Sequence, residues 1–165
     1  MSSEIIFRHP VLEDGIDVFD LIERCPPLDQ NSSYCNFLQC SHFADTCVAA
    51  EMDGDLVGFV SGYRLPSDSS ILFVWQVAVD SRARGQGLAS KMIMHLLSQP
   101  SCRNVTHVHT TITEANEASW ALFRGLAAKL DCGLASKKLM DQERHFKGRH
   151  DSEFLVHLGP FASAS

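Results

Sequence analysis

Two arginines and two closely spaced glycines in the segment 80–89 (Asp-Ser-Arg-Ala-Arg-Gly-Gln-Gly-Leu-Ala) have the spacing that most directly suggests chemistry. The segment follows a run of strand-forming residues, 71–79, and leads into a stretch with helical spacing. A strand that turns directly into a helix leaves several backbone N–H groups without partners, and the positive end of the helix dipole adds to them. Gly87 lacks a Cβ atom, so the backbone there can approach a pyrophosphate closely. The segment is therefore predicted to bind a phosphate group.

Two common phosphate-binding loops do not fit this segment. The sequence has no Gly-x-x-x-x-Gly-Lys-Ser/Thr motif, and residues 85–87 lack the third glycine of the dinucleotide-binding fingerprint. The remaining pattern, Arg84-x-x-Gly87-x-Ala89 after a strand, resembles the Arg/Gln-x-x-Gly-x-Gly/Ala signature of the GNAT superfamily of acyl-CoA-dependent N-acyltransferases. The resemblance implies that the loop amides hold the pyrophosphate of coenzyme A. An ordinary strand-to-helix turn with a solvated arginine pair is the alternative.

A second segment, 113–123, looks like the Asn-x-x-Ala-x-x-Leu-Tyr segment of the same superfamily, in which the asparagine contacts the pantetheine arm and the tyrosine often protonates the departing thiolate. Asn116 occupies the asparagine position, and Phe123 stands in place of the tyrosine. Because a phenyl ring has no proton to give, water or another group must protonate the thiolate, or the thiolate leaves unprotonated. Asn116 also suits a helix cap, which is the alternative role. The resemblance assigns the cofactor to Val77, Val79, Arg84, Gly85, Gln86, Gly87, Leu88, Ala89 and Asn116.

Four further segments, 25–34, 42–51, 73–79 and 148–153, resemble the L-2,4-diaminobutyrate acetyltransferases of ectoine biosynthesis. This resemblance extends over nearly the whole chain. It implies acetyl transfer from acetyl-CoA to the side-chain (γ) amine of L-2,4-diaminobutyrate, which gives N4-acetyl-L-2,4-diaminobutyrate and CoA, with no metal and in a homodimer. Around the amino acid it places Asp29, Tyr34, Trp75, His150 and Glu153.

The chemistry of this substrate suits these five side chains. Asp29 and Glu153 offer negative charge to its ammonium groups, Tyr34 and His150 are hydrogen-bond donors, and Trp75 offers a flat aromatic surface. The γ-ammonium must lose a proton before or during its attack, and Glu153, Asp29 and His150 are the candidate catalytic acceptors. We expect direct attack in a ternary complex, with the oxyanion held by a backbone N–H near 77–79 and without a cysteine acyl-enzyme.

Each of these assignments has a structural alternative. Asp29 suits a helix cap, Tyr34 and Trp75 suit packing positions, and His150 and Glu153 suit solvated positions before the last strand. Two other functions also remain open: a GNAT enzyme that acetylates another amine, and a non-catalytic module that binds acetyl-CoA.

The composition predicts one globular domain over residues 1–165, with 159–165 as a flexible tail. Of the 165 residues 45% are hydrophobic, and the net charge of -6 argues against nucleic acid or an anionic membrane as a partner and favours a small cationic substrate. The sequence has neither a signal peptide nor a run of about 20 apolar residues, so we expect a cytoplasmic protein. The scattered cysteines are expected to be reduced core residues, and His107-x-His109 lacks a further metal ligand at suitable spacing.

The order of apolar patterns predicts a mixed central sheet with helices on both faces, an α/β (α+β) fold that is GNAT-like. Apolar Ile16, Phe19 and Ile22 predict a helix, and Asp53-Gly54 predicts a hairpin turn. The expected strands are 5–8, 47–50, 56–60, a central strand 71–79, 105–111 and 153–158, and the expected helices are 14–23, one that begins near 31, 87–98 and 115–130.

Overall fold

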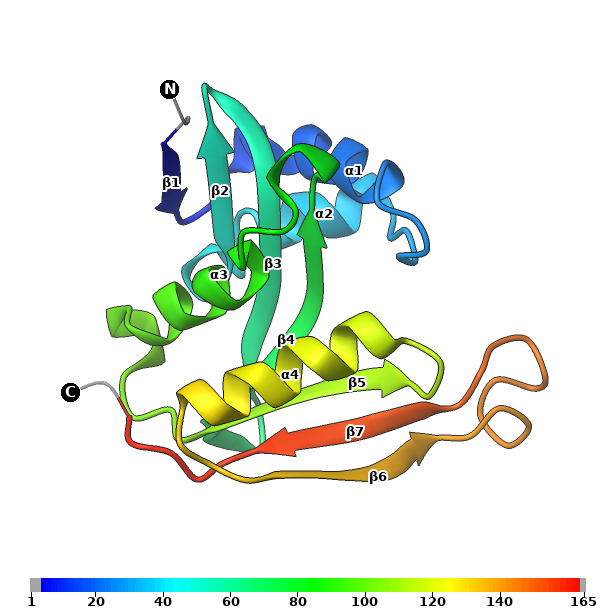
Figure 1. The fold of residues 1–165 in the computed structure, drawn as a ribbon. Helices are drawn as coiled ribbons and strands as arrows, with labels where there is room; N and C mark the ends of the chain where they lie inside the picture. The colour runs from blue at the N-terminus through cyan, green and yellow to red at the C-terminus, as the bar shows by residue number, and fades with distance from the viewer. Residues whose placement is uncertain (1–3, 164–165) are drawn as a thin grey trace. The chain divides into compact units, whose positions relative to one another are not determined.

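A computed structural model describes residues 4–163, which fold into seven strands and four α-helices (Figure 1). The strands are β1 (Ile5–Arg8), β2 (Val48–Met52), β3 (Asp55–Leu65), β4 (Asp68–Val79), β5 (His107–Thr113), β6 (Leu134–Met140) and β7 (Glu153–Leu158). The α-helices are α1 (Gly15–Glu23), α2 (Ser33–Gln39), α3 (Leu88–Leu97) and α4 (Glu117–Lys129). The short 3-10 helices are η1 (Leu12–Asp14), η2 (Ala44–Thr46), η3 (Ser81–Ala83) and η4 (Pro100–Cys102).

The strands form one mixed sheet in the order β1-β2-β3-β4-β5-β7-β6. The β4–β5 pair is parallel, whereas β1–β2, β2–β3, β5–β7 and β6–β7 are antiparallel. The predicted mixed sheet is therefore confirmed, and β4 is its central strand as expected. The described residues group into two compact units: the first contains residues up to 63 together with 74–103, and the second contains 64–73 and 104–163.

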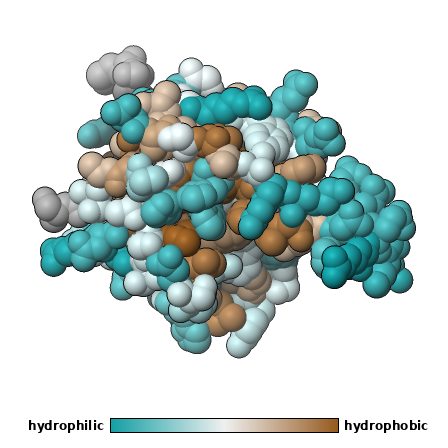
Figure 2. Space-filling model, turned by 90° about the horizontal axis from the view of Figure 1, so that it is seen from below, coloured by the Kyte–Doolittle hydropathy of each residue, from teal (hydrophilic) through white to brown (hydrophobic). Residues whose placement is uncertain are grey.

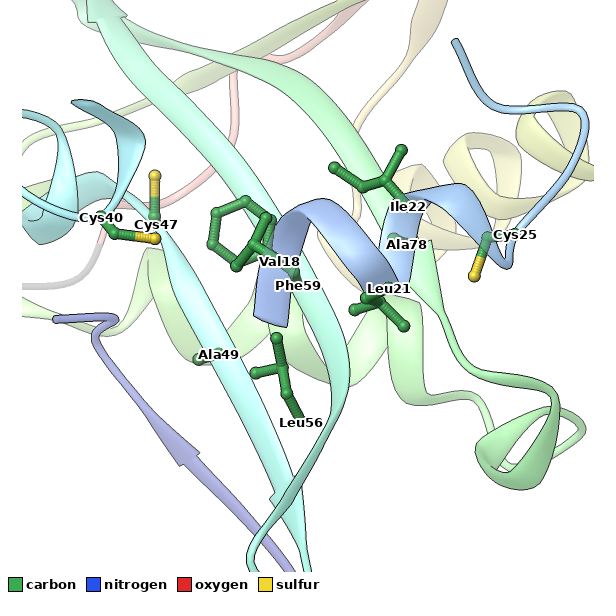
Figure 3. Packing of buried hydrophobic residues seen from close by; sticks show 10 residues of the cluster. All are labelled: Val18, Leu21, Ile22, Cys25, Cys40, Cys47, Ala49, Leu56, Phe59 and Ala78. Carbon is green, nitrogen blue, oxygen red and sulfur yellow. The ribbon is translucent and has the colours of Figure 1, made fainter. Parts of the chain in front are cut away.

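The core of the first unit is built where α1 meets its strands (Figure 3). Val18, Leu21 and Ile22 are buried, and their i, i+3, i+4 spacing forms one apolar stripe on the helix. The helix predicted from Ile16, Phe19 and Ile22 is confirmed as α1. Of these three residues Ile22 is buried, whereas Ile16 is 48% exposed. The other members of the core cluster are Cys25, Cys40, Cys47, Ala49, Leu56, Phe59 and Ala78.

The six cysteines are free thiols, and four of them are buried. Burial raises the pKa of Cys40 and of Cys47 to about 12, so both thiols stay protonated at neutral pH. A thiol must ionise to act as a nucleophile. These two cysteines therefore serve as small apolar residues in the core.

In the second unit, β5 alternates between buried and half-buried residues, which is the pattern of a strand with one covered face. Helix α4 buries Phe123, Leu126 and Ala127, and its Trp120 donates a hydrogen bond to the carbonyl oxygen of Thr113 at the end of β5 (3.1 Å). None of the helices within residues 4–163 combines the length and the apolar character needed to cross a membrane.

Strand β6 was missed by the sequence prediction. All of its residues from Ala135 to Met140 are exposed, so the sequence carries no alternation of buried and exposed positions. Pairing with β7 alone makes this segment a strand. The adjoining segment 141–152 projects from the same unit as a polar group of residues at the right of Figure 2.

The segment predicted as a flexible tail, 159–165, is hydrogen-bonded at its start. The amide of Gly159 donates to the oxygen of Gly133 (3.2 Å), and the amide of Phe161 donates to that of Thr106 (2.9 Å). The side chain of Phe161 is buried. Residues 164 and 165 lie outside the described part of the chain.

Candidate functional site

The predicted phosphate loop lies between the end of β4 and the start of α3. Gly85 and Gly87 have positive φ angles of 79° and 68°, which side chains other than glycine rarely adopt. Gly87 is the N-cap of α3, so the amides of the first turn, from Leu88, point out of the helix end without an intrahelical acceptor. A Cβ atom added at either glycine would meet no atom within 4 Å. The space beside this backbone is therefore open to a ligand.

Asp80 fixes the start of this loop. It is 4% exposed, and its carboxylate accepts hydrogen bonds from the amide of Arg82 (3.0 Å) and from the guanidinium of Arg24 (2.9 Å). Burial alone would raise the pKa of Asp80, but the Arg82 amide and the two guanidinium groups outweigh it and hold the pKa at about 2. Asp80 is therefore a permanently charged structural residue at neutral pH.

Arg84 links the loop back to β4, because its Nε donates to the carbonyl oxygen of Val79 (3.2 Å). The amide of Asp80 donates to the oxygen of Val57 (2.8 Å), so the end of β4 is also bonded to β3. Val77 and Val79 are half-buried. The residues assigned to the cofactor at 77–89 thus form one continuous, well-anchored turn.

Asp29 lies in the segment before α2 and does not cap that helix. The N-cap is Ser32, whose hydroxyl accepts from the amide of Cys35 (3.1 Å). The carbonyl oxygen of Asp29 accepts a hydrogen bond from Nε2 of Gln76 (2.7 Å), and Asn31 Nδ2 donates to Gln76 Oε1 (3.4 Å). The segment that carries Asp29 is therefore bonded to β4 at the residue next to Trp75.

Gln76 is a residue that the sequence analysis missed as part of the site. The only sign of it in the sequence is that Gln76 is the one amide side chain within the apolar run 71–79. A polar side chain at a half-buried strand position needs a hydrogen-bond partner. That requirement marks Gln76 as a candidate, but the sequence does not identify its partner 47 residues away.

Trp75 and Tyr34 are accessible aromatic residues, so the core-packing alternatives for them are wrong. Trp75 is 39% exposed, and its ring makes edge contacts with Phe43 and Tyr63 at centroid distances of 6.4 and 6.0 Å. Edge-to-face geometry fixes the orientation of such rings. Tyr34, in the first turn of α2, is 71% exposed. Trp75 is therefore held in place by neighbouring rings while part of its surface stays available.

The remaining predicted residues belong to the second unit. Asn116 caps α4, since its Oδ1 accepts from the amide of Ser119 (3.2 Å), so the capping role is confirmed. Phe123 is 2% exposed and lies in the buried face of α4. A buried phenyl ring at this position cannot serve as a general acid.

His150 lies in the loop before β7 and Glu153 is the first residue of β7, and neither is fully solvated. His150 is half-buried, its Nδ1 lies 2.6 Å from the oxygen of Asp151, and its ring packs on Phe146 with a centroid distance of 4.6 Å. Glu153 is half-buried as the first residue of β7, and its Oε2 atom is buried. Both side chains are therefore held in defined positions.

Asp141 organises the loop 141–152, which contains His150 and leads into β7. The amides of Glu143 and Arg144 and the ammonium of Lys138 all donate to its carboxylate, and the Arg144 amide contributes most to holding its pKa at about 2. Within the described part of the chain, no group of three or more His, Cys, Asp or Glu side chains is placed so that it could hold a metal ion.

Comparisons with known proteins agree with this geometry. Residues 16–127 match the model of the acetyltransferase (GNAT) family. The chain is 53% identical over 157 residues to an L-2,4-diaminobutyric acid acetyltransferase of Methylotuvimicrobium alcaliphilum, covering 95% of this chain and 91% of that protein. It is 49% identical to the protein of the same name from Vibrio parahaemolyticus, covering 95% and 87%.

A solved structure with 39% identity covers 99% of both chains with a TM-score of 0.93. That protein is the diaminobutyrate acetyltransferase EctA from Paenibacillus lautus, in complex with its substrate L-2,4-diaminobutyric acid and coenzyme A.

Proposed function

This chain belongs to the acetyltransferase (GNAT) family and, within it, to the L-2,4-diaminobutyric acid acetyltransferases, and from that premise we propose that it acetylates the γ-amine of L-2,4-diaminobutyrate with acetyl-CoA. The products are N4-acetyl-L-2,4-diaminobutyrate and CoA, within ectoine biosynthesis. The observation that carries the proposal is the agreement, over 99% of both chains, with an enzyme that was solved with this amino acid and coenzyme A.

The cofactor is proposed to bind along the turn from β4 to α3. Amides at 85–89 donate to the pyrophosphate, and the positive end of the α3 dipole adds to the attraction. The backbone of Val77 and Val79 lies beside the thioester, where an N–H group stabilises the oxyanion of the tetrahedral intermediate. Asn116 contacts the pantetheine arm with its amide nitrogen while its Oδ1 caps α4.

The amino acid is proposed to contact Asp29, Tyr34, Trp75, His150 and Glu153. Carboxylates of Asp29 and Glu153 face the ammonium groups, and Tyr34 and His150 donate to the α-carboxylate. The accessible part of Trp75 lies against the short carbon chain, because its ring is oriented by Phe43 and Tyr63.

The reaction needs a proton acceptor for the γ-ammonium, and we assign this role to Glu153, with His150 and Asp29 as the other candidates. The neutral amine then attacks the thioester carbon directly and the C–N bond forms. The intermediate loses a second N–H proton to water, and its collapse breaks the C–S bond. Because Phe123 is buried and has no acidic proton, the CoA thiolate takes its proton from water or leaves as the thiolate.

Thiol release from acetyl-CoA, measured against a panel of amines, tests this proposal. We expect selective turnover with L-2,4-diaminobutyrate, and NMR of the product should place the acetyl group on the γ-nitrogen. Turnover with other amines only, such as polyamines, would replace the proposed substrate. Binding of CoA without any turnover would identify a non-catalytic module.

We also propose that the protein is a cytoplasmic homodimer, as its resemblance to this family implies. The cytoplasm supplies acetyl-CoA. Light scattering on the purified protein should give a mass near twice 18.3 kDa. A monomeric mass at working concentration would contradict the dimer without affecting the proposed reaction.

A further inference from the structure

Three histidines gather in a hollow of about 400 Å³ in the second unit, and its lining includes none of the residues assigned to the reaction above. We call it the histidine hollow. Its polar lining consists of His107 and His109 from β5, His157 from β7, Ser136 and Lys137 from β6 and Asp68 from β4. Each of these four strands thus contributes at least one charged or titratable side chain to the hollow.

The strand geometry explains why the imidazoles meet. His107 and His109 are two residues apart on β5, so both lie on the same face of the sheet. His157 is directly opposite His109 in the antiparallel β5–β7 pair. The ring centroids are 4.8 Å apart for His109 and His157, and 5.1 Å apart for His107 and His157. Lys137 comes from the neighbouring β6, which pairs with β7.

Asp68 is the one acidic residue among those that line the hollow. Its carboxylate accepts hydrogen bonds from the amide and the hydroxyl of Ser70, at 3.0 and 2.6 Å. His107 has a neighbour of its own, because its Nδ1 lies 2.9 Å from the hydroxyl of Thr106. His157 differs, since its Nε2 is buried and has no hydrogen-bond partner among the described residues. Buried polar atoms of native proteins usually have such a partner, so the His157 ring has unused hydrogen-bonding capacity beside the hollow.

We propose that the histidine hollow is a binding site for a small oxyanion, either a carboxylate or an inorganic oxyanion, held among His109, His157 and Lys137. Imidazolium and ammonium groups donate charge-assisted hydrogen bonds to such a ligand. A metal ion does not fit, because the described His, Cys, Asp and Glu side chains offer no group that could hold one.

Anion binding in the hollow is linked to proton uptake. Burial lowers the pKa of His109, and the neighbouring His157 and His107 lower it further while Asp68 opposes them. Burial also lowers the pKa of His157, and His107 and Lys137 add to the effect. A bound anion offsets the repulsion between the positive charges of these groups and raises the histidine pKa values. At least one histidine therefore takes up a proton when the anion binds.

Titration of the full-length protein with sodium sulfate tests the proposal, with the histidine ring signals followed by NMR. Sulfate stays a dianion between about pH 6 and pH 8, so any pH dependence comes from the protein. We expect saturable shifts of the His107, His109 and His157 signals. If one proton is taken up, the apparent affinity weakens by up to about tenfold for each pH unit above the histidine pKa. Sodium chloride at equal ionic strength is the reference, and a parallel titration with acetate distinguishes a carboxylate site from an inorganic one.

Two variants and a control locate the site. His157→Gln should weaken sulfate binding by about tenfold or more, and Lys137→Gln, on an exposed strand position, by several-fold. His42→Gln, at an exposed position in the first unit, should bind as the wild type does. Shifts that grow linearly with salt, shifts that chloride reproduces, or equal affinity in wild type and Lys137→Gln would each overturn the proposal. If His157→Gln does not fold, the test rests on two measurements: the histidine NMR shifts of the wild type, and the sulfate affinity of Lys137→Gln relative to the wild type.

Discussion

At the scale of single residues, Gln76 connects two parts of the sequence that carry proposed substrate contacts. Its amide bonds both the carbonyl oxygen of Asp29 and the side chain of Asn31, and it stands next to Trp75. Gln76 is therefore a positioning residue for the segment before α2. Its contribution should be visible in substrate affinity and absent from cofactor affinity.

Replacement Gln76→Ala removes both hydrogen bonds to the segment 29–31. One to two lost hydrogen bonds correspond to roughly a tenfold effect, so KM for L-2,4-diaminobutyrate should rise by about tenfold. KM for acetyl-CoA should be unchanged in steady-state kinetics. Gln99→Ala, which removes a hydrogen bond to His95 elsewhere in the first unit, is the control and should change neither constant. An equal rise in both KM values would assign Gln76 a general structural role.

Replacement Glu153→Gln keeps the size of the side chain and removes its charge. Loss of a general base typically lowers turnover by about 100-fold or more, so kcat should fall by that factor while acetyl-CoA still binds. Rapid-quench or thiol-release assays measure the change. Glu143→Gln, in the exposed loop 141–152, should leave kcat unaltered. Wild-type kcat in the Glu153→Gln enzyme would remove Glu153 from the reaction.

At the scale of elements, the turn between β4 and α3 was predictable because it is encoded locally. Arg84, Gly87 and Ala89 lie within six consecutive residues, and the two positive φ angles need glycine where glycine stands. By contrast, β6 owes its structure to pairing with β7 and carries no signal of its own. The contact between residues 29 and 76 and the identity of the buried face of α1 also depend on packing between distant segments, which spacing within one segment does not encode.

Gly87→Ala should affect the cofactor more than the fold. The added methyl group strains a backbone at φ 68° by about 1–2 kcal/mol and enters the space proposed for the pyrophosphate. We expect KM for acetyl-CoA to rise by at least about tenfold, with a modest loss of Tm. Gly54→Ala is the matched control, because Gly54 also has a positive φ (82°) and open space around it but lies in the β2–β3 turn. If both variants lose only stability, Gly87 has no special role in binding CoA.

At the scale of the whole molecule, the titratable groups set how stability depends on pH. The pKa values of His95, His109 and His157 are lowered in the folded protein, with burial as the largest cause. In the unfolded chain these histidines have the ordinary pKa of about 6.5, so between that value and the folded values the unfolded state binds more protons. The stability that these groups maintain is therefore complete above about pH 6.5 and is lost as the pH falls toward the folded pKa values.

Thermal unfolding in chloride buffers measures this dependence. Tm should be constant from about pH 8 to pH 7 and should fall as the pH drops below about 6.5, before Asp80 and Asp141 begin to titrate. His157→Gln should reduce the slope, because one of the three groups is removed. A Tm that rises on acidification across this range would contradict the direction of the histidine shifts.

The buried Asp80 affects how fast the enzyme should bind acetyl-CoA. Its bonds to Arg24 and Arg82 hold the start of the turn after β4 in one conformation. A binding loop that already has its bound conformation loses little conformational entropy when the ligand binds, and binding needs no slow conformational change. Binding of acetyl-CoA should accordingly follow a single exponential in stopped-flow fluorescence, with an observed rate constant that increases linearly with cofactor concentration and does not level off.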